Sequence, residues 1–227
     1  MRLPVLALLP FFAINFARAD VLQSTTTLPP PAGAYDFSSI CLSSGPDRCL
    51  VDPVLHDFSN YSQSEVAGNE LVSVDAVYSA DVYTNNGGTP GTLLGPIELT
   101  GTLGIVYSNR NPSFHALGTF DTQVVNFDLT GTFDGNTFEV IQNPSLSSTG
   151  VTTILPADGS DPNRPLYDVS GYLDINGEYS FNGSPFLPGP PRMGTLTPEP
   201  ASGALGAAIL AVLLSLASLR QRDQQIR

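Results

Sequence analysis

The stretch GTFDTQVVNFDLTGTFDGNTFEVIQ, residues 118–142, carries the clearest structural signal in the sequence. Apolar and polar side chains alternate along its first half, which is the period of a β-strand with one buried face. Asp134-Gly135 then supplies a tight turn, and alternation resumes at Phe138. The stretch therefore predicts a β-hairpin. Four side chains are expected on one face of its first strand: Val125, Phe127, Leu129 and Phe133.

The same alternation recurs in residues 71–83 and 97–107, and residues 167–181 repeat the hairpin pattern around Asn176-Gly177. No long helix is predicted between the two ends of the chain. Strands joined by turns predict an all-β fold, an antiparallel β-sandwich, with jelly-roll-like and barrel-like arrangements as alternatives. The apolar faces of the first two segments consist of Val72, Val74, Ala76, Tyr78, Ala80 and Val82, and of Ile97, Leu99, Leu103, Ile105 and Tyr107.

The charge of the chain excludes one class of partner. Its nine basic residues are all arginines, and between Asp20 and Thr197 four arginines stand against 19 acidic residues, a net charge of −15. Binding to a phosphate backbone requires clustered positive charge. Nucleic acid is therefore not an expected partner.

The chain begins with the features of a secretory signal peptide, predicted over residues 1–19. One arginine precedes a short apolar run, and Ala17-Arg18-Ala19 forms a small-x-small cleavage site. Cleavage is expected after Ala19, so that Ala17 and Ala19 are the recognised residues. The alternative is an N-terminal membrane anchor, although the run is short and contains two prolines.

Export decides how the two cysteines are interpreted. Cys41 and Cys49 flank the turn residues Gly45-Pro46-Asp47, and an oxidising compartment favours a disulfide between them. The alternatives are a free thiol pair or metal ligands. Neither of the two histidines has zinc-site spacing to the cysteines.

The residues between the two ends show no catalytic motif. His56 and His115 belong to no zinc-hydrolase helix, no nucleophile-elbow motif occurs, and both are interpreted as ordinary histidines. Paired carboxylates leave a secreted hydrolase as an alternative function. Weak calcium candidates are Asp174, Asn176 and Glu178, although a hairpin turn explains Asn176 more simply. No cofactor is expected.

Residues 201–219 form an uninterrupted run of small and apolar residues at the C-terminal end. As a helix the run would be roughly 28 Å long, enough to cross a bilayer core. Arg220, Arg222 and Arg227 follow it, and positive charge stays on the cytoplasmic side. The sequence predicts a transmembrane helix with the main domain outside the cell membrane.

The order of features at this end resembles a known sorting signal. Pro198-Glu199-Pro200, the apolar span and the terminal arginines are similar to the PEP-CTERM signal of exported bacterial proteins. That resemblance implies recognition by an exosortase, a membrane-embedded enzyme expected to cut near the Pro-Glu-Pro motif. It further implies that the helix anchors the protein in the inner membrane only until processing sends it to the cell surface or extracellular matrix.

A second resemblance covers more of the chain. Residues 118–131, 143–154 and 172–200 are similar in order and spacing to a group of PEP-CTERM proteins with GTFDTEM-like and ESPTxASTGxTTI-like segments. This sequence departs from the group's pattern at Gln123-Val124 and Asn143-Pro144. The resemblance implies an all-β exported domain and nothing catalytic.

Together these features predict six segments and a non-enzymatic envelope or matrix protein. The expected partners are the Sec export machinery, the sorting enzyme and the membrane, with extracellular polysaccharide as a further candidate. A calcium- or carbohydrate-binding adhesion module is a second alternative to this function. The predicted segments are a signal peptide at 1–19, a Thr/Pro-rich extended leader at 20–34, an all-β ectodomain at 35–187, a Pro-rich linker at 188–200, the transmembrane helix at 201–219 and an Arg-containing tail at 220–227.

Overall fold

The computed structural model describes residues 20–42 and 47–198 of the chain. Within these ranges every regular element is a β-strand, as the alternating sequence predicts. The strands are β1 (Val21–Gln23), β2 (Gly33–Phe37), β3 (Ile40–Leu42), β4 (Arg48–Val66), β5 (Asn69–Asn85), β6 (Pro90–Tyr107), β7 (Gly118–Phe133), β8 (Asn136–Gln142), β9 (Ser148–Pro156), β10 (Tyr167–Ile175), β11 (Gly177–Phe181), β12 (Leu187–Pro188) and β13 (Arg192–Pro198).

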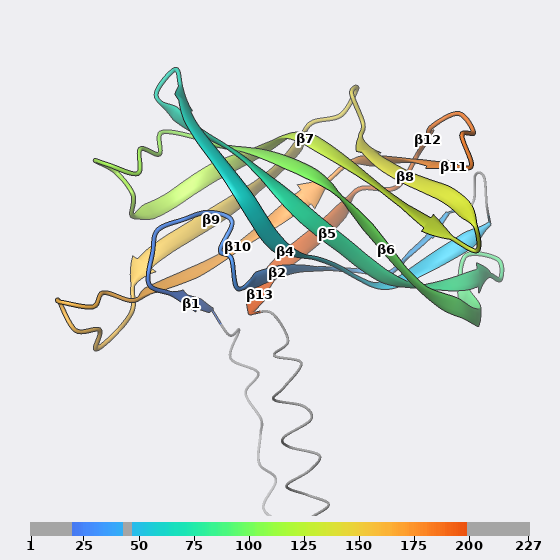
Figure 1. Ribbon diagram of the computed structural model, residues 1–227, viewed down its shortest axis with the longest axis horizontal. Helices are drawn as coiled ribbons and strands as arrows, with labels where there is room; N and C mark the ends of the chain where they lie inside the picture. The colour runs from blue at the N-terminus through green and yellow to red at the C-terminus, as the bar shows by residue number, and fades with distance from the viewer. Residues whose placement is uncertain (1–19, 43–46, 199–227) are drawn as a thin grey trace, which may run out of the picture.

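The strands form one antiparallel sheet whose hydrogen bonds return to the starting strand. The ring runs β10-β13-β2-β4-β5-β6-β7-β9 and back to β10. The layer formed by β4 to β7 crosses the layer of β9, β10 and β13 behind it (Figure 1). β1 pairs with β10, β3 with β4, and β8, β11 and β12 extend the sheet from β7. This single ring matches the barrel-like arrangement rather than the two separate sheets of a sandwich.

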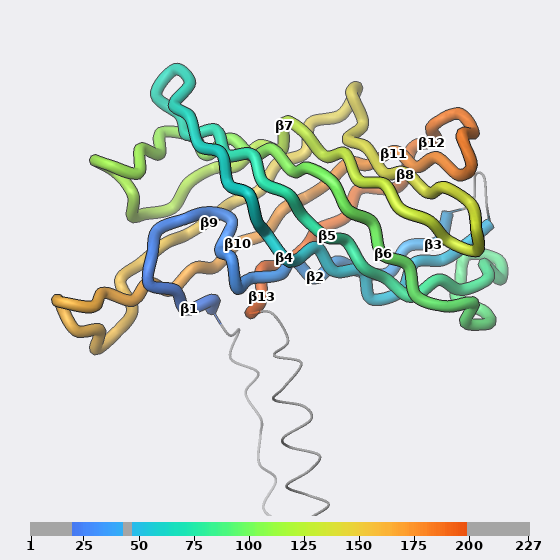
Figure 2. The backbone as a smooth tube through the Cα atoms, viewed as in Figure 1, coloured from blue at the N-terminus to red at the C-terminus, as the bar shows by residue number. Residues whose placement is uncertain are grey.

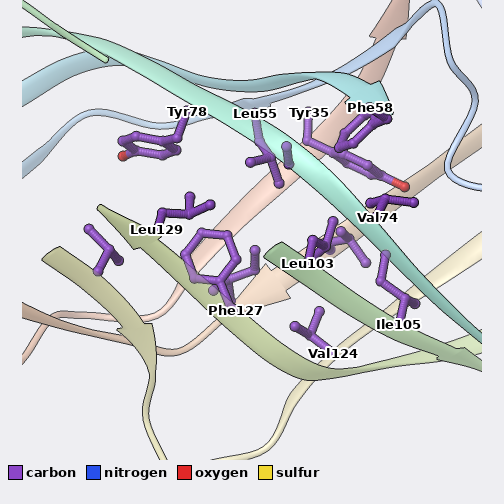
Figure 3. Packing of buried hydrophobic residues seen from close by; sticks show 14 of the residues in the cluster. Tyr35, Leu55, Phe58, Val74, Tyr78, Leu103, Ile105, Val124, Phe127 and Leu129 are labelled. Atoms are coloured by element: carbon purple, nitrogen blue, oxygen red, sulfur yellow. The ribbon is translucent and has the colours of Figure 1, made fainter. Parts of the chain in front are cut away.

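The inward faces of the ring make one hydrophobic core. The apolar faces predicted for residues 71–83 and 97–107 are buried in it throughout. Figure 3 shows side chains of β4 to β7 packed together with Tyr35 of β2, among them Leu55, Leu103 and Phe127. Burial of one such side chain stabilises a fold by about 1.5–3 kcal/mol, so this shared interior is the main source of stability.

The two predicted hairpins have different outcomes. The turn at Asp134-Gly135 is confirmed: both residues have positive φ, and Phe133 pairs with Asn136 across it. The prediction of a hairpin at Asn176-Gly177 is wrong, because β10 and β11 do not pair with each other. β10 pairs with β9 and β13, whereas β11 pairs with β8 and β12. Asn176 instead marks a break within one extended segment.

Most of the long strand β4 lies before residue 64, in a region that has no visible period in the sequence. Its pairing with β5 is interrupted by three register shifts, between residues 51 and 54, 56 and 59, and 59 and 62. Each bulge inserts a residue and exchanges the inward and outward faces. The period of two is therefore reset three times along the strand, which hides it from sequence analysis.

A smaller bulge changes one predicted face in β7. Phe127 and Leu129 are buried as expected, but the side chain of Val125 is 45% exposed. The register with β6 shifts at this point, so that Ile105 pairs with Val124 and not with Val125. Upstream of the bulge the buried residues are consequently Val124, Thr122 and Phe120.

The sheet extends beyond the ectodomain limits of 35–187 at both ends. β1 and the first residues of β2 lie in the predicted leader, and Leu28 between them is fully buried. β13 lies in the predicted linker and pairs with both β10 and β2. The backbone trace brings β1 and the end of β13 to the same side of the domain (Figure 2).

Candidate functional site

A groove opens at one end of the ring, where β4 and β5 project beyond the core. Its volume is about 330 Å³. One wall is formed by Gln63, Ser64 and Glu65 of β4, and the other by residues 111–114 of the loop that follows β6. Glu65 of this wall is directly paired with Glu70 of β5, and Glu70 belongs to the floor of the groove.

The floor contains an ion pair between Arg110 and Glu70. Their side chains are 0% and 2% exposed, and Arg110 Nη1 contacts Glu70 Oε2. Arg110 Nη2 also donates to the carbonyl of Thr26 in the N-terminal segment. The guanidinium lies over the rings of Tyr107 and Phe120, at 5.8 and 5.7 Å from their centroids. A charged pair at this depth needs such partners to offset its lost hydration.

Two polar atoms of this pair are left without a hydrogen-bond partner among the described residues, Glu70 Oε1 and Arg110 Nε. Burial lowers the pKa of the Arg110 guanidinium to about 10. The adjacent Glu70 carboxylate supplies the opposite charge that a buried guanidinium needs. Because buried polar atoms are normally satisfied, the floor retains an unused capacity for hydrogen bonds.

The loop over the groove, residues 109–117, is held by a dense set of hydrogen bonds. Asn111 organises it: its Oδ1 accepts from Ser113 N, its carbonyl accepts from His115 N, and its Nδ2 donates to Glu65 Oε2 at 3.0 Å. The loop is further fixed by Asn109 N, which donates to Asn69 Oδ1. This scaffold presents the side chain of Phe114, which is 91% exposed, at the edge of the groove.

The groove has little capacity to attract an anion. Arg110, the one cation among the described residues that line the groove, is already neutralised by Glu70, and Glu65 adds a further negative charge. The remaining polar lining consists of the amide of Gln63 and the hydroxyls of Ser64 and Ser113 beside Asn111. These groups donate and accept hydrogen bonds without carrying charge. The arrangement is suited to binding a neutral polar molecule rather than to acid–base chemistry.

A second arrangement lies on the outer face of the sheet around His56. His56 Nε2 is 3.0 Å from Ser79 Oγ of β5, and His56 Nδ1 is 3.0 Å from Asp57 Oδ2. The order of contacts is that of a Ser-His-Asp triad, in which the carboxylate orients the imidazole and the imidazole takes the hydroxyl proton. Sequence reasoning missed this proximity, because it depends on the bulged register between β4 and β5.

The surroundings of His56 nevertheless differ from those of a catalytic triad. The Asp57 side chain is 62% exposed, so water weakens its hold on the imidazole. Ser79 lies mid-strand with ladder partners on both sides, Val54 and Glu98. The adjoining groove of about 380 Å³ is lined by Asp57 and Asp75, whose carboxylates would oppose a developing oxyanion. His56 therefore makes the contacts of a catalytic triad, but its surroundings would not stabilise the negative charge that develops in the reaction.

The weak calcium candidates Asp174, Asn176 and Glu178 lie around the break between β10 and β11. The side chain of Asn176 donates from Nδ2 to the carbonyl of Ser147 and its backbone N–H to Ser148 Oγ. Asp174 lies in β10 and Glu178 in β11, on either side of this break. Among residues 20–42 and 47–198 no group of three or more His, Cys, Asp or Glu side chains could hold a metal ion.

The predicted disulfide is present between Cys41 and Cys49, which are directly paired residues of β3 and β4. Pro198 is the last residue of β13. Ala17, Ala19, Glu199, Pro200, Arg220, Arg222, Arg227 and the predicted span 201–219 lie outside the described residues. In the part of the chain that the structure describes, no helix is long and apolar enough to cross a membrane.

Comparison of the chain with protein-family models, with curated proteins and with solved structures finds no match. The groove was also not foreseen from the sequence. Glu70 and Arg110 are 40 positions apart in sequence, and neither belongs to a motif. The one signal available beforehand was an arginine in a region that is otherwise almost without basic residues.

Proposed function

We propose that this chain is an exported, non-enzymatic surface protein whose C-terminal segment is a PEP-CTERM signal processed by an exosortase-type enzyme. The domain would be held outside the inner membrane by residues 201–219 and then delivered to the cell surface or extracellular matrix. The Cys41–Cys49 disulfide supports this location, because such bonds persist in oxidising compartments.

The observation that carries the proposal is the position of the two proposed cleavage points relative to the sheet. β1 begins at Val21, two residues after Ala19, and β13 ends at Pro198, where it pairs with Gly33. Removal of the segments outside these points would leave every strand of the ring intact. A sorting signal placed directly after the last strand would release a complete domain.

Fractionation of the native host tests the sorting step. We expect the wild-type protein at the cell surface or in the medium, and a Glu199→Ala/Pro200→Ala variant retained in the inner membrane. Glu98→Ala, an exposed glutamate on β6, is the matched control and should fractionate like the wild type. Identical fractionation of the sorting variant and the wild type would contradict the proposal.

A further inference from the structure

We infer that the groove over the Arg110–Glu70 pair is a binding site for a neutral, hydroxyl-rich glycan, with Phe114 as the stacking surface for a sugar ring. This inference rests on the proposed function only in placing the domain outside the cell, where polysaccharide is available. It names a ligand class and a site that the sorting signal does not imply.

Phe114 is exposed on a loop whose backbone is held by hydrogen bonds. An aromatic ring that is 91% exposed contributes almost nothing to the core. Its neighbours nevertheless make specific hydrogen bonds: Phe114 N to Asn111 O at 3.2 Å and His115 Nδ1 to Asn109 O at 2.9 Å. These hydrogen bonds hold the backbone that carries Phe114, and its exposed aromatic face is suited to stacking against the apolar C–H face of a sugar.

The polar side chains that line the groove match the hydrogen-bonding groups of a sugar. Sugar hydroxyls both donate and accept, and the lining offers both functions through Gln63, Ser64, Glu65 and Ser113. A volume of about 330 Å³ lies within the range of small-molecule sites and suits one or two sugar rings.

The charges around the groove favour a neutral ligand. An anionic glycan would meet Glu65 and a surface with a net charge of −15 between Asp20 and Thr197, while the single arginine of the groove is already paired. A cationic ligand would find no advantage over the many other carboxylates of this surface. A neutral glycan is therefore the class of ligand that would bind in this groove in preference to other parts of the surface.

The position of the groove agrees with such a role. The β4–β5 hairpin and the loop after β6 project at the upper left of the domain, whereas β1 and the end of β13 lie at its lower side (Figure 1). A domain attached through the residue after Pro198 would therefore hold the groove away from its point of attachment. The site would face the surrounding polymer.

Affinity electrophoresis of the full chain tests the inference. The protein would be purified in a zwitterionic detergent, since detergents with sugar headgroups would compete, and run through native gels containing dextran, laminarin, xylan or anionic alginate. We expect retardation by at least one neutral polysaccharide and none by alginate. Phe114→Ala should weaken the interaction by about two- to tenfold, the loss expected for one stacked ring.

Phe186→Ala is the matched control, because Phe186 is also exposed, at 37%, but lies outside the groove. It should bind like the wild type, and circular dichroism should show that both variants are folded. Failure of the wild type to bind any neutral member, preference for alginate, or equal binding by Phe114→Ala would each overturn the inference. These outcomes are independent of fractionation, so the binding site and the sorting step fail separately.

Discussion

At the scale of single residues, the feature with the largest energetic consequence is the buried pair of Arg110 and Glu70. Both side chains are removed from water, and each relies on the other for electrostatic compensation. The pair also links three segments, because Arg110 contacts Thr26 of the N-terminal segment as well as Glu70 of β5. Loss of either member would leave an uncompensated charge beneath the groove.

We therefore expect Glu70→Gln to lower the free energy of unfolding by about 3–5 kcal/mol. Replacing both members with apolar residues, as in Glu70→Leu/Arg110→Met, removes the buried charge and should recover most of that loss. Urea unfolding of the full chain, followed by circular dichroism, measures both effects. A single variant as stable as the wild type would show that the pair is compensated from elsewhere.

The contacts of His56 lead to an expectation about reactivity. Because Asp57 is exposed and the adjoining groove is acidic, Ser79 should not be an activated nucleophile. A fluorophosphonate probe should leave Ser79 unmodified, as judged by peptide mass spectrometry. Labelling that disappears in His56→Ala and in Ser79→Ala would contradict the non-enzymatic proposal.

Sequence reasoning was least informative at this scale. The alternation in β5 and β6 predicts which side chains are buried, because a local period of two determines the face. Which residues of different strands meet depends on register, and each bulge in β4 alters that register. The Glu70–Arg110 and His56–Ser79 contacts could therefore not be predicted from the sequence. The disulfide could be predicted, because Cys41 and Cys49 lie only eight residues apart.

At the scale of elements, curvature determines whether the sheet can form a ring. Gly101 of β6 lies against Asp128 of β7, and a Cβ atom at this position would fall well inside van der Waals contact with the backbone oxygen of Asp128. A glycine within a strand often marks such a close approach or bend. The close approach of β6 and β7 therefore depends on the absence of a side chain at this position.

Gly101→Ala should consequently destabilise the fold by about 1–3 kcal/mol, as overpacking does. Gly177→Ala is the matched control, because its nearest neighbours would be 3.6 Å away, an ordinary contact, and its φ is not positive. Urea midpoints compare the two variants. Equal urea midpoints for Gly101→Ala and Gly177→Ala would show that β7 can move aside without a loss of stability.

The elements themselves were predictable where turns and alternation agreed. The β7–β8 hairpin was predicted because Asp134-Gly135 separates two alternating segments. The Asn176-Gly177 dipeptide has the same local appearance, yet the strands beside it pair with β9 and β8 instead of with each other. Local turn propensity cannot distinguish the two cases, because the difference lies in partners far away in sequence.

At the scale of the whole molecule, buried tyrosines make the fold sensitive to alkali. Burial raises the pKa of Tyr179 to about 12, and it raises the pKa values of Tyr35, Tyr78 and Tyr107 as well. Between pH 10 and 12 the unfolded chain has lost phenolic protons that the folded chain keeps. The free energy of unfolding must therefore fall as the pH rises through this window.

We expect the β-sheet signal in circular dichroism to be constant up to about pH 10 and to be lost cooperatively above it, together with a late rise in phenolate absorbance. Tyr179→Phe removes one of the responsible groups and should move the transition to higher pH. Early ionisation of these tyrosines with an intact sheet signal would show that they are accessible to water.

The central claim, processing of both ends around an intact ring of strands, is tested most directly by the intact mass of the mature protein from its native host. The account predicts a species that begins at Asp20, ends close to Pro200 and retains the Cys41–Cys49 disulfide, and it predicts that cells without the sorting enzyme keep the C-terminal segment. A mature protein that still ends at Arg227 in wild-type cells would contradict it.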